Sequence, residues 1–433
     1  MSRTMKDTGI PWVGSIPQNW KLGRVKQGFF RKKAEAHEEN PVVLSLARAG
    51  VKVRDISNNE GQLAESYYNY NPVVPGDLLL NPMDLYSGAN CSISKVSGVI
   101  SPAYINLGAK KGFNPSYYDY YFKTQYWAMA MFAHGKGVSF DNRWTLNAND
   151  LLNYYIPIPD KCEQDRIAIC LDNECKRIDN IISKTQASIE EYKKLKQSII
   201  TQAVTKGVRG DREMKNSEIK WIGEVPSDWK LTPFRRVLKE RSEKNSPVKS
   251  TERLSLSIDL GVTLYSEKTT NLDRFKDDFE QYKLAYEGDL VMNSMNMIVG
   301  ASGVSNYFGC VSPVYYTFYD EEEDHITAKY CEYIFRSKTM LRVLYSLGKG
   351  IYAIERGDDR VNTCRLKVSK EDLKKIILPQ PSIAEQREIV EYLNEKCEEI
   401  DVLIKKKENL ISQIEQYKRS LVYEYVTGKK EVV

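Results

Sequence analysis

The stretch Ile10–Leu22 reads IPWVGSIPQNWKL, and the stretch Ile219–Leu231 reads IKWIGEVPSDWKL. The two tryptophans of each stretch are related by one offset of 209 residues, since 221 − 12 and 229 − 20 are equal. Four of the six tryptophans in the 433-residue chain lie in these stretches, so chance is a poor explanation. The sequence therefore predicts an internal duplication, which indicates two copies of one structural unit.

Further motifs recur in the same order in both halves. They are GDLLLN at 76–81 with GDLVMN at 288–293, SPAY at 101–104 with SPVY at 312–315, GKG at 135–137 with GKG at 348–350, and PIP at 157–159 plus Glu163-Gln164 with PQP at 379–381 plus Glu385-Gln386. Between these motifs the copies differ freely, and residues 353–364 have no partner in the first copy. A shared framework with variable segments is therefore predicted.

Each copy divides into a globular part and a long helix. Short β-like runs such as Val73–Leu80 and Leu290–Asn293 alternate with Gly, Asn and Pro turns and one helix-like stretch, which predicts an α/β (α+β) domain of mixed β-sheet and helices. The Pro-x-Pro motifs end each domain because a helix cannot easily run through them. The predicted parts are residues 1–160, helix 161–207, linker 208–217, residues 218–382 and helix 383–428.

Both helices carry a heptad repeat with apolar residues at positions a and d. In the first helix, a is Ala168, Cys175, Ile182, Ile189, Lys196 and Ala203, and d is Leu171, Ile178, Thr185, Tyr192 and Ile199. In the second, a is Val390, Cys397, Ile404, Ile411, Lys418 and Tyr425, and d is Leu393, Ile400, Lys407, Ile414 and Leu421. Strict 3–4 spacing over about five heptads is typical of a coiled coil.

The length of the helices favours pairing with each other over packing on their own domains. About 36 residues of helix span roughly 54 Å, which would overrun a small domain. We expect an antiparallel coiled coil that places the two domains at opposite ends about a pseudo-twofold axis. Lys196, Lys407 and Lys418 lie on the seam, where polar residues fix register and orientation.

Composition excludes several classes of protein. A hydrophobic content of 42% and a charged content of 28% describe a globular protein, and no apolar run reaches the eighteen or so residues of a membrane span. The polar N-terminal segment predicts no signal peptide. The cysteines are scattered singly and the three histidines are isolated, which favours a reducing cytoplasm and argues against a metal site. The net charge of +5 permits nucleic-acid binding without requiring it.

Taken together, the W-x-G-x-x-P-x-x-W-x-L motif, Gly-Asp-Leu, Pro-x-Pro with Glu-Gln, and a long helix ending in Val-Thr resemble the specificity subunit of type I restriction-modification systems. The resemblance covers essentially the whole chain. It implies that each variable globular part is a target-recognition domain for double-stranded DNA and each helix a conserved spacer. It also implies two modification (methyltransferase) subunits and restriction subunits as partners, with S-adenosylmethionine, ATP and Mg bound by those partners and no cofactor or chemistry on this chain.

Motifs for catalysis are absent from the sequence. An adenine methyltransferase needs a loop of the type (Asp/Asn/Ser)-Pro-Pro-(Tyr/Phe), and the chain contains no Pro-Pro pair. A GxxxxGK[ST] phosphate loop is missing as well. Two alternatives stay open: a single-chain methyltransferase or nuclease with diverged motifs, and a coiled-coil adaptor that does not bind DNA.

Direct reading of DNA needs Arg, Lys, Asn or Gln side chains on loops that reach base edges in the major groove. The candidates in the first domain are Arg48, Lys52, Arg54, Asn58, Asn59, Asn81, Asn90, Lys136, Asn142 and Arg143. Those in the second domain are Asn293, Asn296, Lys349, Arg356, Arg360 and Arg365. One sequence does not separate base contacts from phosphate contacts, and the two domains are expected to read different half-sites.

Overall fold

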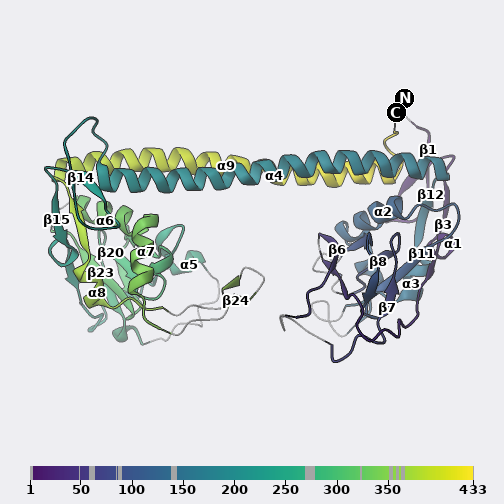
Figure 1. Ribbon diagram of the computed structural model, residues 1–433, viewed down its shortest axis with the longest axis horizontal. Helices are drawn as coiled ribbons and strands as arrows, with labels where there is room; N and C mark the ends of the chain where they lie inside the picture. The colour runs from purple at the N-terminus through teal and green to yellow at the C-terminus, as the bar shows by residue number, and fades with distance from the viewer. Residues whose placement is uncertain are drawn as a thin grey trace. The chain divides into compact units, whose positions relative to one another are not determined.

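The two halves of the chain form equivalent sets of elements in the computed structural model (Figure 1). The structure describes residues 3–47, 49–57, 64–83, 85, 90–137, 144–268, 278–321, 324–350, 355–356, 360–361 and 366–432. Two compact units are present: the first comprises residues 1–186 and 408–433, and the second comprises residues 187–407. Each unit therefore contains one globular domain, one end of the first long helix and one end of the second.

The first unit is built on a four-stranded antiparallel sheet in the order β4-β11-β8-β9. The elements up to the first long helix are β1 (Met5–Asp7), β2 (Ser15–Pro17), β3 (Lys21–Arg24), α1 (Val25–Gly28), β4 (Phe29–Arg31), β5 (Leu44–Ala47), β6 (Gly50–Val53), β7 (Asn71–Val73), β8 (Leu78–Leu80), β9 (Cys91–Ile93), β10 (Gly98–Ile100), β11 (Ile105–Ala109), α2 (Pro115–Trp127), α3 (Ala148–Asn153), β12 (Tyr155–Ile158) and α4 (Lys161–Lys206). Two-stranded pairs β1-β2, β3-β12, β5-β6 and β7-β10 surround the sheet.

The second unit repeats this topology with the sheet order β16-β23-β20-β21. Its elements are β13 (Met214–Asn216), β14 (Glu224–Pro226), β15 (Lys230–Pro233), β16 (Lys239–Arg241), β17 (Leu254–Ser257), β18 (Gly261–Leu264), α5 (Tyr265–Lys268), β19 (Lys283–Ala285), β20 (Leu290–Asn293), β21 (Ser302–Val304), β22 (Gly309–Val311), β23 (Tyr315–Tyr319), α6 (Ile326–Arg336), α7 (Lys338–Leu347), β24 (Glu355–Arg356), β25 (Arg360–Val361), α8 (Lys370–Lys375), β26 (Ile377–Gln380) and α9 (Ile383–Val426). The predicted mixed α/β class is confirmed.

The repeated Trp and Glu-Gln motifs hold the start of each long helix against its domain. The buried indole Nε1 of Trp20 donates a hydrogen bond of 2.7 Å to Glu163, in the first turn of α4. Arg3 completes the group with an ion pair of 2.5 Å to the same carboxylate. A carboxylate is favoured there because the helix dipole is positive at its N-terminus.

The second unit contains the same arrangement. The Trp229 indole donates to Glu385 over 3.1 Å, and Arg212 forms an ion pair with that carboxylate. Arg212 also lies over the Trp229 ring, 5.9 Å from its centre. These sequence motifs therefore serve the framework of the fold.

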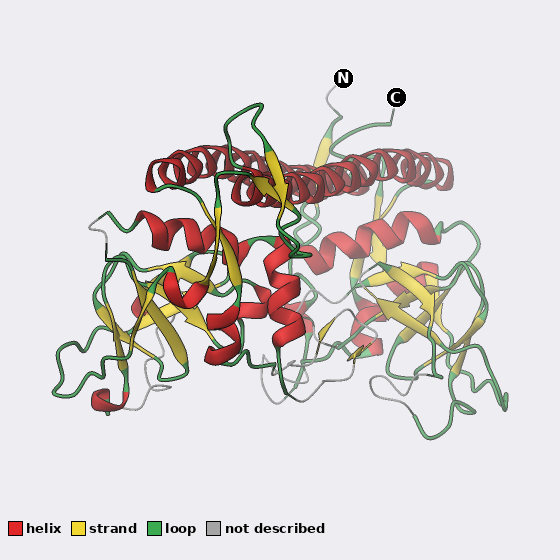
Figure 2. Cartoon of the chain, turned by 60° about the vertical axis from the view of Figure 1, so that its left-hand side comes forward, coloured by secondary structure: helices red, strands yellow, loops and turns green. Residues whose placement is uncertain are grey.

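Each hydrophobic core is completed by the end of the helix that follows the other domain. In the first unit Val426, at the end of α9, is buried beside Tyr117 of α2, whose hydroxyl donates 2.7 Å to the Val426 carbonyl. In the second unit Val204, near the end of α4, accepts a hydrogen bond of 3.2 Å from Tyr330 of α6. In each domain a shorter helix, α2 or α6, packs between the sheet and the long helices (Figure 2).

The predicted pairing of α4 with α9 is confirmed, and within each unit the two helices run antiparallel. Every residue assigned to position a or d is buried or partly buried, including Leu171, Ile178, Ile182, Ile189, Ile199, Leu393, Ile400, Ile404, Ile411, Ile414 and Leu421. Their neighbours at the other positions are mostly exposed in the middle of both helices. Among the described helices, none combines the length and apolar character of a membrane span.

The seam lysines have carboxylate partners across the pair. Lys196 donates to Asp401 over 2.6 Å in the second unit, and Lys418 donates to Asp179 over 2.6 Å in the first. The third, Lys407, lies 5.6 Å from the centre of the Tyr192 ring. Exposed ion pairs contribute about 0–1 kcal/mol each, so their main effect is to select one antiparallel register, as polar seam residues do.

Buried seam residues of α4 should contribute more to the free energy of unfolding than its exposed residues. Leu171 is 0% exposed at position d, whereas Leu195 on the same helix is 48% exposed. We expect Leu171→Ala to lower the free energy of unfolding by about 2–5 kcal/mol, because it removes buried methyl groups and leaves a cavity. Leu195→Ala, the matched control, should change it by about 0.5 kcal/mol or less. Calorimetric melting of the two variants checks this, and equal shifts in Tm would contradict the assignment.

Candidate nucleic-acid interface

Part of the predicted DNA-binding set falls on segments whose structure is not described. Arg48, Asn58, Asn59, Asn142, Arg143 and Arg365 lie outside the described residues. Arg356 and Arg360 are placed by their backbone alone, in the β24-β25 hairpin. These eight residues stay sequence predictions, and the site is built below from the others.

Asn81 and Asn293 occupy the same place in the two units, at the end of β8 and of β20. Each uses its side chain to shape the turn that follows: the Oδ1 of Asn81 accepts the N–H of Met83 over 3.0 Å, and the Oδ1 of Asn293 accepts that of Met295 over 3.0 Å. Such side-chain turns are common for Asn. The Oδ1 atoms of Asn81 and Asn293 thus accept hydrogen bonds from backbone N–H groups. Asn296, three residues after Asn293, is exposed.

The turn after Asn81 gathers the other described candidates of the first unit. The Asn81 N–H donates 3.0 Å to the Asn90 carbonyl. The Asn90 amide donates in turn to the Ala47 carbonyl at the tip of the β5-β6 hairpin. Lys52 lies exposed on β6 of that hairpin, and Arg54 follows it, half-buried. The asparagine turn therefore adjoins the β5-β6 hairpin, which carries Lys52.

The Gly-Lys-Gly turns adjoin this edge in both units. Lys136 exchanges two backbone hydrogen bonds with Thr145, of 2.9 and 3.0 Å, and Lys349 does the same with Lys367. The residues that follow these pairs contact the asparagine turns. The Leu146 N–H donates to the Pro82 carbonyl over 2.9 Å, and the Val368 N–H donates to the Ser294 carbonyl over 3.0 Å. The structure thus brings the glycine-flanked lysines next to the asparagine turns.

The lysines of these turns can exchange their present partners for a phosphate. Lys136 is 80% exposed and lies 3.3 Å from Asp150, and Lys349 is 78% exposed and lies 3.0 Å from Asp372. The hydrogen bond from Lys349 holds the pKa of Asp372 below its usual value. Surface pairs of this kind are weak, so an external anion can compete for the ammonium group.

The aspartates of the Gly-Asp-Leu motifs have a structural role. Asp289 is 1% exposed, accepts the N–H of Tyr286 over 2.9 Å and pairs with Arg241 over 2.6 Å. Burial raises the pKa of Asp289 although Arg241 opposes the rise. Asp77 takes the same place in the first unit, with Lys32 at 2.7 Å. Asp289 joins the turn before β20 to Arg241 of the edge strand β16, and Asp77 joins the turn before β8 to Lys32, directly after the edge strand β4.

Sequence reasoning missed a group of lysines beside the second turn. Lys283 is half-buried and donates 2.9 Å to the Tyr315 carbonyl. Burial and the nearby Lys370 and Lys367 lower the pKa of Lys283. The stretch 367–375, KVSKEDLKK, has four lysines where the first copy has TLNANDLLN at 145–153, and this difference was a usable signal.

Glu240 balances part of this charge. It accepts hydrogen bonds from Lys370 over 2.6 Å and from Lys374 over 2.5 Å. Burial opposes its ionisation, but these bonds hold the pKa of Glu240 at about 2. Among the described residues, His, Cys, Asp and Glu form no group that could hold a metal ion. The edge is thus a cationic and amide-bearing surface suited to an anion.

Two curated proteins are similar in sequence to this chain. The type I restriction enzyme MjaVIII specificity subunit of Methanocaldococcus jannaschii is 26% identical over 288 residues, which are 65% of this chain and 63% of that protein. The putative MjaX specificity subunit of the same organism is 24% identical over 307 residues, 67% of this chain and 63% of that protein. The chain is thus similar in sequence to curated specificity subunits of type I restriction enzymes. No family model matches the sequence.

A solved structure shares the fold of this chain. A chain from a structural study of complex assembly and conformational transition of the type I R-M system has a TM-score of 0.68 and 14% identity. The match covers 96% of this chain and 99% of that one. The alignments to the curated relatives span 63% of their length.

The buried aspartate gives a test of the framework role. Asp289→Ala would leave Arg241 without its partner, and breaking a buried pair costs about 3–5 kcal/mol. Glu287, two residues earlier and exposed, supplies the control: Glu287→Ala should stay within about 0.5 kcal/mol of the wild type. Thermal melting of the full chain measures both. If Asp289→Ala melted like the wild type, the Gly-Asp-Leu motif would need another explanation.

Proposed function

We propose that this chain is the non-catalytic DNA-recognition subunit of a type I restriction-modification complex and reads a bipartite target. The observation that carries the proposal is that one framework is present twice with different chemistry at the same edge. The asparagine turn reads Asn81-Pro82-Met83 in one unit and Asn293-Ser294-Met295 in the other. The segment after the Gly-Lys-Gly turn has one aspartate and no lysine in the first unit (residues 145–153), whereas its counterpart in the second unit (residues 367–375) has four lysines. Two different half-sites follow, one for each domain.

Direct readout fits the residues on this edge. Exposed Asn and Lys side chains can donate to base edges in the major groove, and the paired lysines of the Gly-Lys-Gly turns suit phosphates, which set position but carry no sequence information. We assign Lys136 and Lys349 to phosphates, because their place is shared by both copies. Base contacts then fall to the residues that differ between the copies.

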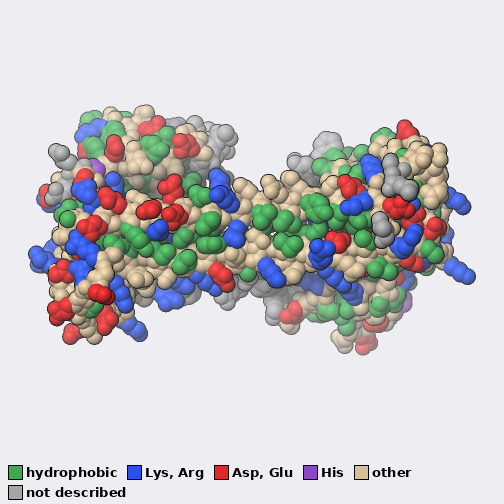
Figure 3. All heavy atoms as spheres, turned by 90° about the horizontal axis from the view of Figure 1, so that it is seen from above, with side chains coloured by type: hydrophobic (Ala, Val, Ile, Leu, Met, Phe, Trp, Pro, Cys, Tyr) green, Lys and Arg blue, Asp and Glu red, His purple; other side chains and the backbone are tan. Residues whose placement is uncertain are grey.

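The partners proposed are two modification subunits, together with restriction subunits. The long helices support this because apolar residues at position g stay exposed: Ile181 and Tyr417 in the first unit, Leu195 and Leu403 in the second. Figure 3 shows apolar side chains gathered along these helices. Exposed apolar surface of this kind marks protein contacts. In this proposal S-adenosylmethionine, ATP and Mg are bound by the partners, no cofactor is bound by this chain, and the complex works in the cytoplasm.

Exchange of one domain tests the proposal. Replacing residues 23–150 with those of another specificity subunit should change one half of the methylated target and leave the other half intact, because each domain reads its own bases. Genomic methylation mapping in the host, with the wild-type chain, the chimera and no chain, gives the answer. Loss of the chain should abolish methylation at the bipartite site. A chimera that altered both halves, or a deletion without effect, would refute the proposal.

The paired helices should also set the distance between the half-sites. Seven residues inserted after Gln186 in α4 and seven after Lys407 in α9 keep the seam in register. A heptad adds about 10 Å of helix at 1.5 Å per residue. The preferred spacer should then lengthen by about three base pairs, since duplex DNA rises about 3.4 Å per pair. Insertion of four residues in each helix, which breaks the seam, is the control. An unchanged spacer after the heptad insertion would rule out the helices as a ruler.

A further inference from the structure

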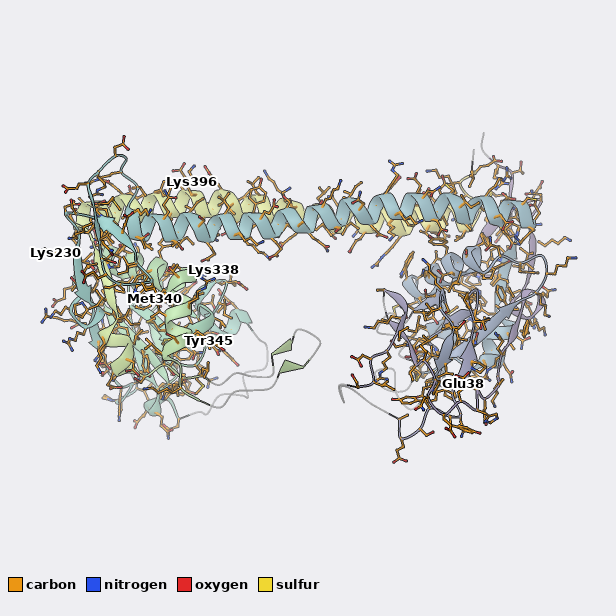
Figure 4. The ribbon with its side chains drawn as sticks, viewed as in Figure 1. Glu38, Lys230, Lys338, Met340, Tyr345 and Lys396 are labelled. Atoms are coloured by element: carbon orange, nitrogen blue, oxygen red, sulfur yellow. The ribbon has the colours of Figure 1, made fainter. Side chains whose placement is uncertain are left out.

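A groove in the second unit runs between the C-terminal half of α4 and the globular domain. Its volume is about 880 Å³. One wall is α4 from Glu190 to Lys206, and the other is formed by Trp221, Ile222 and the first turn of α7. Lys338 begins α7 on the side of the domain that faces α4 (Figure 4).

Positive charge dominates the groove. Lys193, Lys194, Lys206, Lys338 and Arg342 line it, against one carboxylate, that of Glu190. Glu190 accepts a hydrogen bond of 2.9 Å from Lys193. The remaining four cations make no ion pair with any described residue. Like charges along one concave surface raise the local potential and attract anions.

Cations are spread along the wall of the groove that α4 forms. Lys193 and Lys206 are separated by 13 positions, or about 20 Å of helix at 1.5 Å per residue. Lys338 and Arg342 face them from α7 and are four positions apart, on one side of that helix. One strand of duplex DNA carries a phosphate about every 3.4 Å along the axis. The groove thus matches a linear polyanion better than a single small anion.

The first unit lacks this groove chemistry. Alignment of the helix seams relates α4 to α9 by 222 residues, since 390 − 168 is 222. Lys193 and Lys194 then correspond to Glu415 and Gln416. At the position of Gln197, the first unit has Arg419, which lies over the Trp127 ring at 5.9 Å. Two identical partner subunits would be expected to bind a surface that both units share. The cationic groove is present in the second unit alone, so we connect it with the DNA, which the two units are proposed to read differently.

Helix α7 connects the groove to the candidate interface of the same domain. It begins at Lys338 in the groove and ends at Leu347, directly before Gly348 and Lys349 of the Gly-Lys-Gly turn. Its ten residues span about 15 Å. A DNA backbone held at Lys349 is therefore within a few phosphates of the groove.

We propose that this groove binds the phosphate backbone of DNA that flanks the half-site read by the second domain. This inference rests on the proposed DNA-reading function and adds to it a sequence-independent contact on one side of the complex. The alternative occupant is an acidic segment of a partner protein. Gln197, whose buried Oε1 has no hydrogen-bond partner, would offer an acceptor to a peptide N–H.

The test removes charge from the groove alone. We would combine Lys194→Gln, Lys338→Gln and Arg342→Gln in the full chain, in complex with its modification subunit. The matched control is Lys184→Gln, Lys405→Gln and Lys406→Gln, three exposed lysines of the long helices outside the groove. Because all six side chains are exposed, both variants should melt like the wild type.

Binding to a duplex that carries the methylated target is then measured against salt concentration. The groove variant should lose at least about ten-fold in affinity, and the slope of log K against log salt should fall by about two to three, at about 0.9 per phosphate contact. Phosphate-ethylation interference should lose signals flanking the second half-site alone. The target sequence should not change.

Three other results would overturn the inference. A groove variant with the slope and interference pattern of the control would show that the groove does not meet DNA. A variant that no longer assembles with the modification subunit would identify the groove as a docking site for an acidic protein segment. Failure of the wild-type complex to prefer its bipartite target would remove the proposed function itself.

Discussion

The exchange of helix ends between the two copies is the constraint on which the rest of the structure depends. Val426 of α9 closes the core of the first domain, and Val204 of α4 closes that of the second, each with its carbonyl held by a buried tyrosine hydroxyl. Each helix must therefore run from its own domain to the other core, which requires the antiparallel pairing. Neither copy would have a complete core without the helix end that the other copy supplies.

Buried carboxylates hold the helix starts and the turns that precede the variable segments. Glu163 and Glu385 hold the helix starts through Trp20 and Trp229, and buried aspartates hold the turns before β8 and β20. Buried ionic groups add little net stability but are costly to disturb. The framework is thus rigid where the copies agree, and the edges it supports can change without loss of the fold.

The two units share a fold but differ in the positive charge that they carry at equivalent positions. The second unit carries Lys283, Lys367 and Lys370 beside its asparagine turn and a cationic groove along α4. The lysines that line the groove are exposed, and exposed side chains contribute little to stability in either direction. The positions of these lysines can therefore differ between the units without loss of stability. Long-range attraction to polyanions and contacts with phosphates depend on such positive charge and weaken with salt.

By itself, the sequence determined the duplication, the mixed fold class and the heptad seam, because periodicity and repeated motifs are local patterns. Seam positions such as Leu171 and Ile400 are buried as that pattern predicts. Only the tertiary structure decided that Lys196 pairs with Asp401, that the Asn81 and Asn293 side chains shape turns, and that lysines of α4 and α7 share one groove. These contacts join residues distant in the chain or depend on side-chain direction, which spacing along a sequence does not encode.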